Sequence, residues 1–208
     1  MAAVRLHKLM PEYRGRLRLR IRAFPLEVAS GEAAPRDILE QEWWLAAIQE
    51  PAAEFVPYEG DDWPSTTLPA FEAAWCAFRQ GEEAGLEYDL RVRKAFFAEG
   101  RNIGRREVLL EVAEEAGLEL RRFERDFSGE EPRRAVLEEL REGRESYRVK
   151  GTPTLMLPDG RKLRPPIAYP RLRGRRVVGV GRLPCCGEDC LEQTRRLLEE
   201  AAGRRRDA

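Results

Sequence analysis

The clearest pattern along the chain is a strict alternation of charged and apolar residues between Arg16 and Phe24. Apolar residues occupy every second position from Leu17 to Ala23, and arginines occupy the positions between them. Because successive side chains of a strand point to opposite faces, this period of two predicts a strand with one buried face. We expect this strand to end at Pro25, which cannot donate a ladder hydrogen bond.

Most other apolar residues recur at steps of three and four, which is the spacing of one helix face. The first such helix is predicted from Met1 to Met10, where Pro11 prevents continuation. Several more helices are predicted between residues 37 and 147, where prolines interrupt the pattern. A helical pattern starts at Asp37, and a helix with the apolar stripe Leu68, Phe71, Trp75 and Phe78 starts near Ser65. The next two helices carry Leu86, Leu90 and Phe97, and then Val108, Val112 and Ala116, with Gly117 as the cap. The last one covers residues 131–147.

The last quarter of the chain predicts short strands followed by a helix. An apolar run at Thr154–Leu157 precedes a turn at Pro158–Arg161, which leads toward a second short strand. The range 163–176 is rich in proline and arginine and is expected to be irregular. An edge strand at Val177–Val180 is predicted either in place of the second strand or as its extension. A final helix is predicted from about residue 188 to residue 202.

Two motifs in this order indicate a family. Residues 96–104 have the sequence FFAEGRNIG, followed by EVL and by a helix that ends in AGL. Downstream, Val-Lys-Gly-Thr-Pro-Thr occupies residues 149–154. Together they resemble the DsbA-like thioredoxin-fold family, and within it the FrnE-type and 2-hydroxychromene-2-carboxylate isomerase-type members. The resemblance runs from about Val4 to about Leu163 and returns in the last helix.

The resemblance implies an α/β fold, in which a helical domain is inserted into a thioredoxin-like domain. On this interpretation, residues 1–30 and 148–203 form the thioredoxin-like domain, incomplete at its amino terminus. Residues 31–147 form the inserted helical domain, and residues 204–208 form a tail. No internal repeat or low-complexity segment favours another plan.

Charge and cysteine content argue against several classes of function. The 37 Lys and Arg residues balance the 37 Asp and Glu residues, so no net field attracts nucleic acid or an anionic membrane. The chain has no apolar run of about 18 or more residues and no signal-peptide pattern. Four cysteines are too few for a secreted disulfide framework. We therefore expect a cytoplasmic protein that binds neither nucleic acid nor membrane, whose oligomeric state the sequence does not indicate.

The resemblance also implies a Cys-x-x-Cys motif that this sequence lacks. Family members carry it at the start of the first helix, after a central strand, where helix amides lower the thiol pKa. The printed chain begins inside that helix, at Met1. Either the start is assigned too far downstream or the protein lacks the motif. We expect the former, because loss of an interior strand would leave two neighbouring strands without ladder partners.

The Gly-Thr-Pro-Thr motif is the candidate substrate-binding element. In the family that the chain resembles, a cis-proline loop faces the dithiol. The backbone of the residue before the proline pairs there with an extended substrate or with glutathione. The resemblance therefore implies a substrate-binding role for Thr152 and Pro153, whereas the sequence alone does not reveal the isomer of their peptide bond.

Three of the four cysteines, Cys185, Cys186 and Cys190, are clustered before the last helix. Cys190 could pair with either of the other two, and Cys186 would share a helix face with it if the helix began early. Structural or incidental thiols, an auxiliary redox pair and a metal site all remain open, although a second ligand pair for zinc is missing. Cys76 is interpreted as a small buried hydrophobe, and His7 as an ordinary helix residue without a catalytic partner.

The leading hypothesis is a thiol-disulfide oxidoreductase that acts on protein or peptide thiols and disulfides, is without a cofactor, and is inactive if truncated as printed. A second is a glutathione-dependent isomerase or kappa-class transferase, in which a serine replaces the dithiol. A third is a non-catalytic protein that binds a peptide or partner at the proline loop and the helical insertion. The insertion supplies large apolar side chains that are more often core than ligand site: Trp43, Trp44, Trp63 and Trp75.

Overall fold

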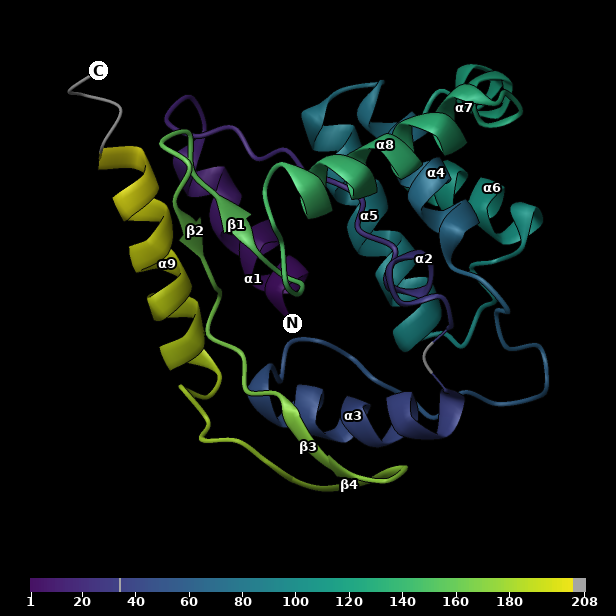
Figure 1. The fold of residues 1–208 in the computed structure, drawn as a ribbon. Coiled ribbons are helices and arrows are strands. Elements are labelled where there is room, and N and C mark those ends of the chain that lie inside the picture. Colours follow the sequence, from purple (N-terminus) through teal and green to yellow (C-terminus); the bar gives the residue numbers. More distant parts are fainter. Residues whose placement is uncertain (34, 204–208) are drawn as a thin grey trace. The chain divides into compact units, whose positions relative to one another are not determined.

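The computed structural model describes residues 1–33 and 35–203, so the predicted tail at 204–208 lies outside the described residues. Backbone contacts divide the chain into two compact units, each of which is discontinuous in sequence (Figure 1). Unit 1 comprises Met1–Leu19, Arg36–Phe55 and Gly151–Ala208, and unit 2 comprises Arg20–Pro35 and Val56–Lys150. A compact unit need not have the same boundaries as an inserted domain. The division into a thioredoxin-like domain and a helical insertion at residues 31–147 therefore stays a prediction.

Unit 1 contains helices from both ends of the chain and four short strands (Figure 1). Its elements are α1 (Ala2–Leu9), the 3-10 helix η1 (Met10–Tyr13), α3 (Arg36–Gln49), β1 (Leu155–Met156), β2 (Lys162–Leu163), β3 (Pro170–Arg173), β4 (Arg176–Val180) and α9 (Glu188–Gly203). The predicted first and last helices are thus confirmed, and Pro11 falls in the 3-10 turn that follows α1. The helical pattern from Asp37 corresponds to α3.

The hydrophobic core of unit 1 lies where α1 and α9 pack side by side (Figure 1). Leu6 and Leu9 of α1 meet Leu198 and Ala202 of α9, and all four side chains are buried. Tyr13 completes this cluster and donates its hydroxyl to the carbonyl of Arg195 at 3.2 Å. Partly buried hydrophobic residues that surround it are Leu17, Leu19, Leu155 and Leu191. The core therefore joins segments from the two ends of the sequence.

The strands of unit 1 form two separate antiparallel pairs. In the first pair, Leu155 of β1 lies opposite Leu163 of β2, and the turn predicted at Pro158–Arg161 connects the two strands. In the second, β3 pairs with β4, and Arg173 lies opposite Arg176. The range 163–176 was expected to be irregular, and this expectation is wrong because β3 lies within it. The strand predicted at Val177–Val180 forms as β4, but its partner is β3 and not β1 or β2.

Unit 2 is helical in its described part. Its elements are α2 (Leu26–Ser30), α4 (Leu68–Phe78), α5 (Glu82–Phe97), α6 (Arg106–Glu115), α7 (Leu120–Phe127) and α8 (Glu131–Glu145). Helix α4 packs against α5 and α8, as its apolar stripe predicts, and Leu68 joins a core with Ala23 and Val136. Helix α7 was not predicted, because charged residues separate Phe123 from Phe127, although both are buried.

A carboxylate from α2 closes the amino-terminal end of α4. Glu27 accepts hydrogen bonds from the backbone amides of Thr67 (3.0 Å) and Leu68 (3.1 Å), and from the hydroxyl of Thr66 (2.5 Å). These amides belong to the four that a helix leaves unpaired at its start. An acidic group there also complements the helix dipole. One side chain from a distant segment thereby stabilises the start of the helix around which unit 2 packs.

The strand predicted at Arg16–Phe24 is wrong. No residue of this segment is assigned to a strand, although burial does alternate along it from Leu17 to Ala23. The period of two thus correctly indicates which side chains point inward, whereas a strand also requires a neighbouring backbone for its ladder. No other strand among the described residues supplies one. Within the same described residues, no helix is long and apolar enough to cross a membrane.

Candidate functional site

The Gly-Thr-Pro-Thr motif forms a partly exposed loop that leads directly into β1. The peptide bond between Thr152 and Pro153 is cis. The hydroxyl of Thr154 donates to the carbonyl of Gly151 at 2.6 Å and so closes the loop. The backbone carbonyl of Thr152 accepts a hydrogen bond at 3.3 Å from the hydroxyl of Tyr169, a residue that is 52% exposed.

The backbone beside this loop has free hydrogen-bonding capacity. In the described part of the chain, the amide of Thr152 has no hydrogen-bond partner. Within the same residues, β1 has a strand partner on one side only, namely β2. An unpaired strand edge presents N–H and C=O groups that a further extended chain can use. The described part of the chain therefore leaves the Thr152 amide and one edge of β1 without a main-chain partner.

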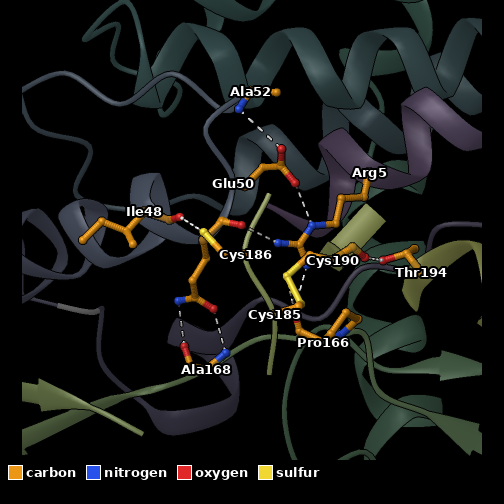
Figure 2. A network of polar contacts seen from close by, with 11 residues as sticks. Arg5, Ile48, Glu50, Ala52, Pro166, Ala168, Cys185, Cys186, Cys190 and Thr194 are labelled. Atoms are coloured by element: carbon orange, nitrogen blue, oxygen red, sulfur yellow. Dashed lines mark hydrogen bonds and ion pairs between the residues drawn. A yellow bond between two sulfur atoms is a disulfide. The ribbon is translucent and has the colours of Figure 1, made fainter. Parts of the chain in front are cut away.

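A buried arginine lies at the centre of the polar network in Figure 2. Arg5 of α1 is fully buried, and its guanidinium donates to Glu50 Oε2 (2.7 Å), to the carbonyl of Gln49 (2.9 Å) and to the carbonyl of Pro166 (2.7 Å). Glu50 is itself 4% exposed. Because a buried charge is costly unless it is paired and hydrogen-bonded, these three contacts account for the presence of an arginine in this interior.

Gln49 extends this network to the segment beside the proline loop. Its side-chain Nε2 donates to the carbonyl of Ala168 at 3.0 Å, and its Oε1 accepts from the amide of Ala168 at 2.7 Å. Ala168 directly precedes Tyr169, whose hydroxyl contacts Thr152. The end of α3 thus fixes the backbone from which Tyr169 reaches the proline loop.

The three clustered cysteines lie at the start of α9, against the same segment (Figure 2). Cys185 and Cys190 form a disulfide with 5.0 Å between their Cα atoms. Cys190 is fully buried, and its sulfur lies 4.0 Å from the Pro166 carbonyl oxygen that Arg5 also contacts. Cys186 is exposed and free, and its thiol donates to the carbonyl of Ile48 at 3.2 Å.

Of the two pairings that the sequence left open, the structure contains the one between Cys185 and Cys190. The alternative required Cys186 and Cys190 to share a helix face. Helix α9 begins at Glu188, so Cys186 precedes the helix and points elsewhere. The described residues contain no group of three or more His, Cys, Asp or Glu side chains arranged to hold a metal ion.

The remaining candidate side chains lie outside this network. Cys76 is fully buried in α4 of unit 2, where burial raises the pKa of its thiol to about 12. This agrees with its interpretation as a small buried hydrophobe. His7 is exposed on α1. Among the tryptophans, Trp43 is buried, whereas Trp44 is 68% exposed and so is not a core residue.

Sequence reasoning missed several residues of the network, namely Arg5, Gln49, Glu50 and Tyr169. One signal could have identified Arg5, because it lies four residues before Leu9 and therefore on the apolar face of α1. A charged residue on the buried stripe of a helix requires a partner. The partners lie 44, 45 and 161 residues away, where no local pattern in the sequence identifies them.

Comparison with known families agrees with this geometry. The model of the DSBA-like thioredoxin domain matches residues 1–176, which include α1, the helices of unit 2 and the Thr152-Pro153 loop. The match ends before Cys185. No curated protein matches the chain. Since the matched segment covers most of the 208 residues, the chain belongs to the DSBA-like thioredoxin domain family.

Proposed function

We propose that this protein exchanges thiols and disulfides with protein or peptide substrates, and that it does so through Cys185 and Cys190. The observation that carries the proposal is the disulfide between these residues, which closes the start of α9 beside the exposed thiol of Cys186. Family membership supports this general class of reaction. In the printed sequence the remaining cysteine, Cys76, is buried in unit 2 and is not accessible for exchange.

The reaction would oxidise a substrate dithiol. A substrate thiolate attacks the sulfur of Cys185, which is partly exposed, and the bond to Cys190 breaks as a mixed disulfide forms. Cys190 leaves as a thiolate. The second substrate thiolate then attacks the substrate sulfur of the mixed disulfide and expels the thiolate of Cys185. The substrate gains a disulfide, and the Cys185–Cys190 disulfide becomes a dithiol by accepting the two electrons.

The position of Cys190 at the start of α9 favours its role as the leaving group. It lies in the first turn of this helix, where the helix dipole stabilises negative charge. A thiolate that is stabilised in this way leaves faster in exchange. The Pro166 carbonyl oxygen, 4.0 Å from its sulfur, does not add to this effect, because an oxygen lone pair repels a thiolate (Figure 2). Glu50 pairs with Arg5 and offsets its positive charge, so this stabilisation comes from the start of the helix.

The substrate-binding element in this proposal is the loop at Thr152 and Pro153. An extended substrate would pair with the free amide of Thr152 and continue along the open edge of β1. The Tyr169 hydroxyl already donates to the carbonyl of Thr152, so a substrate amide that pairs with this carbonyl would share it with Tyr169 or displace Tyr169. Because Tyr169 is more than half exposed, its side chain can turn into solvent.

The proposal is tested by equilibrating the full chain with glutathione buffers of graded redox poise. Alkylation and mass spectrometry then measure the fraction with the Cys185–Cys190 disulfide. We expect this disulfide to equilibrate with the buffer and to oxidise an unstructured dithiol peptide. Cys185→Ser and Cys190→Ser should abolish the oxidation, whereas the matched control Cys76→Ala should retain it. A disulfide that resists reduction across the whole buffer series while the protein stays folded would reject the proposal.

A second candidate, a non-catalytic protein that binds peptides, is favoured by the exposed apolar pair on α3. Trp44 is 68% exposed and Ile48, one turn later, is 55% exposed. If binding is the function, a variant with serine at positions 185, 186 and 190 should hold an extended peptide as tightly as the wild-type protein. The glutathione-dependent isomerase alternative and the cytoplasmic location both stay predictions from the sequence.

A further inference from the structure

The charges of the chain are segregated around the β3–β4 hairpin. The whole sequence has 37 basic and 37 acidic residues. In contrast, the 28 residues from Gly160 to Gly187 contain seven arginines and one lysine, and neither aspartate nor glutamate. The hairpin, at residues 170–180, lies inside this segment. The hairpin is therefore strongly basic, although the protein as a whole has no net charge.

Most of these cations have no counter-ion among the described residues. The side chains of Arg171, Arg173 and Arg176 in the hairpin, and of Arg182 just after it, are exposed, and none makes a hydrogen bond or ion pair with another described residue. Arg173 and Arg176 also lie directly opposite each other in the ladder. Like charges in this position destabilise a strand pair. By contrast, Arg175 of the same hairpin forms an ion pair with Asp37 of α3.

The two outer edges of the hairpin differ. The edge of β4 is held by Gln41 of α3, whose Oε1 accepts from the amide of Val177 at 3.0 Å and whose Nε2 donates to the carbonyl of Arg175 at 3.0 Å. Among the described residues, β4 is the one strand partner of β3. The outer edge of β3 therefore remains available, and it carries Arg171 and Arg173.

We propose that β3 binds an extended acidic segment of a partner polypeptide, which adds to its free edge as a third strand. Residues two apart in a strand share a face, so Arg171 and Arg173 face carboxylates at alternate positions of the added strand. Main-chain pairing supplies affinity that does not depend on the sequence of the partner. The exposed apolar residues Leu172 (48%) and Val178 (58%) suit the intervening side chains of a peptide, whereas a nucleic-acid backbone offers them no apolar contact.

The experiment measures binding of fluorescent ten-residue peptides to the full chain by anisotropy at low salt. The probe alternates glutamate with valine. A second peptide replaces alternate valines with proline, which keeps the charge but removes amide donors. The protein variants are Arg171→Glu/Arg173→Glu and a matched control, Arg121→Glu/Arg134→Glu, which changes the net charge equally at two exposed arginines of unit 2. Circular dichroism verifies that both variants are folded.

We expect the acidic probe to bind, and the hairpin variant to lose at least about tenfold in affinity while the control stays within about twofold. The proline-containing peptide should bind at least about fivefold more weakly than the probe. Equal losses in both variants would overturn the proposal, because they indicate unspecific attraction. Tighter binding of a single-stranded oligonucleotide or of anionic vesicles would also overturn it. Absence of binding would likewise overturn the proposal, and the arginines would then serve to protect the strand edge against aggregation.

Discussion

Arg5 and Glu50 form an ion pair in the interior of unit 1, with 2.7 Å between Nε and Oε2 and side-chain exposures of 0% and 6%. The pair joins α1 to the residue that follows α3, and the carbonyls of Gln49 and Pro166 satisfy the remaining contacts of the guanidinium. Most other ion pairs of the described chain lie at the surface, where solvent weakens them. The buried pair is therefore the electrostatic contact on which unit 1 depends most.

Removing one member of this pair should destabilise the protein strongly. For Arg5→Met we expect a loss of about 3–5 kcal/mol in the free energy of unfolding, because Glu50 is left buried without its partner. The double variant Arg5→Met/Glu50→Leu should recover much of this loss, since it removes both charges. Urea denaturation measures both values.

The control for this pair is Arg141→Met, which breaks the exposed pair with Glu138, where the side-chain exposures are 62% and 58%. It should cost less than about 1 kcal/mol. A similar small loss for Arg5→Met would contradict the view that the buried pair is important for stability.

Burial of Cys76 should make stability depend on alkaline pH. Its pKa is raised to about 12 by burial, from an ordinary value of 9.0. In the unfolded chain the thiol loses its proton above pH 9, whereas the folded protein retains it. Its contribution to stability is therefore fully present below pH 9 and decreases as the pH rises toward 12, by up to about 1.4 kcal/mol per pH unit.

The comparison with Cys76→Ala isolates this effect, because other alkaline groups such as Tyr13 are common to both proteins. The difference in unfolding free energy between wild type and variant should shrink as the pH rises above 9. A difference that stays constant between pH 8 and pH 11 would show that the thiol is not buried as described.

Packing between α4 and α5 should tolerate no side chain at Gly85. A Cβ atom at this position would lie 2.2 Å from Cδ1 of Phe78, far inside van der Waals contact. We expect Gly85→Ala to destabilise unit 2 by about 1–3 kcal/mol, despite the higher helix propensity of alanine. In α9, a Cβ at Gly203 meets no atom within 4 Å. Gly203→Ala should therefore leave stability unchanged or raise it slightly, as thermal unfolding can measure.

The carboxylate of Glu27 should contribute measurably to the stability of α4. Glu27→Ala removes the acceptor for the amides of Thr67 and Leu68, and we expect a loss of about 1–2 kcal/mol. Hydrogen exchange of these two amides should accelerate in the variant. The control is Glu32→Ala, at an exposed position with no such contacts. If the two variants exchange alike, Glu27 does not cap the helix.

The sequence by itself determined those features that depend on neighbouring residues. Apolar residues recur every three or four positions in six helices, which could therefore be predicted from local periodicity: α1, α4, α5, α6, α8 and α9. The order of two motifs was enough to indicate the family, which the match to residues 1–176 bears out. The segment from Leu17 to Ala23 likewise indicated which side chains point inward.

Only the tertiary structure decided the features that depend on residues far apart in the sequence. Whether Arg16–Phe24 becomes a strand depends on a neighbouring backbone, and alternation cannot reveal whether that neighbour is present. Which cysteine pairs with Cys190 depends on where α9 begins and on where Cys186 points. Arg5 is buried because Glu50 and Pro166, 45 and 161 residues away, meet its guanidinium, and only folding places those oxygen atoms there.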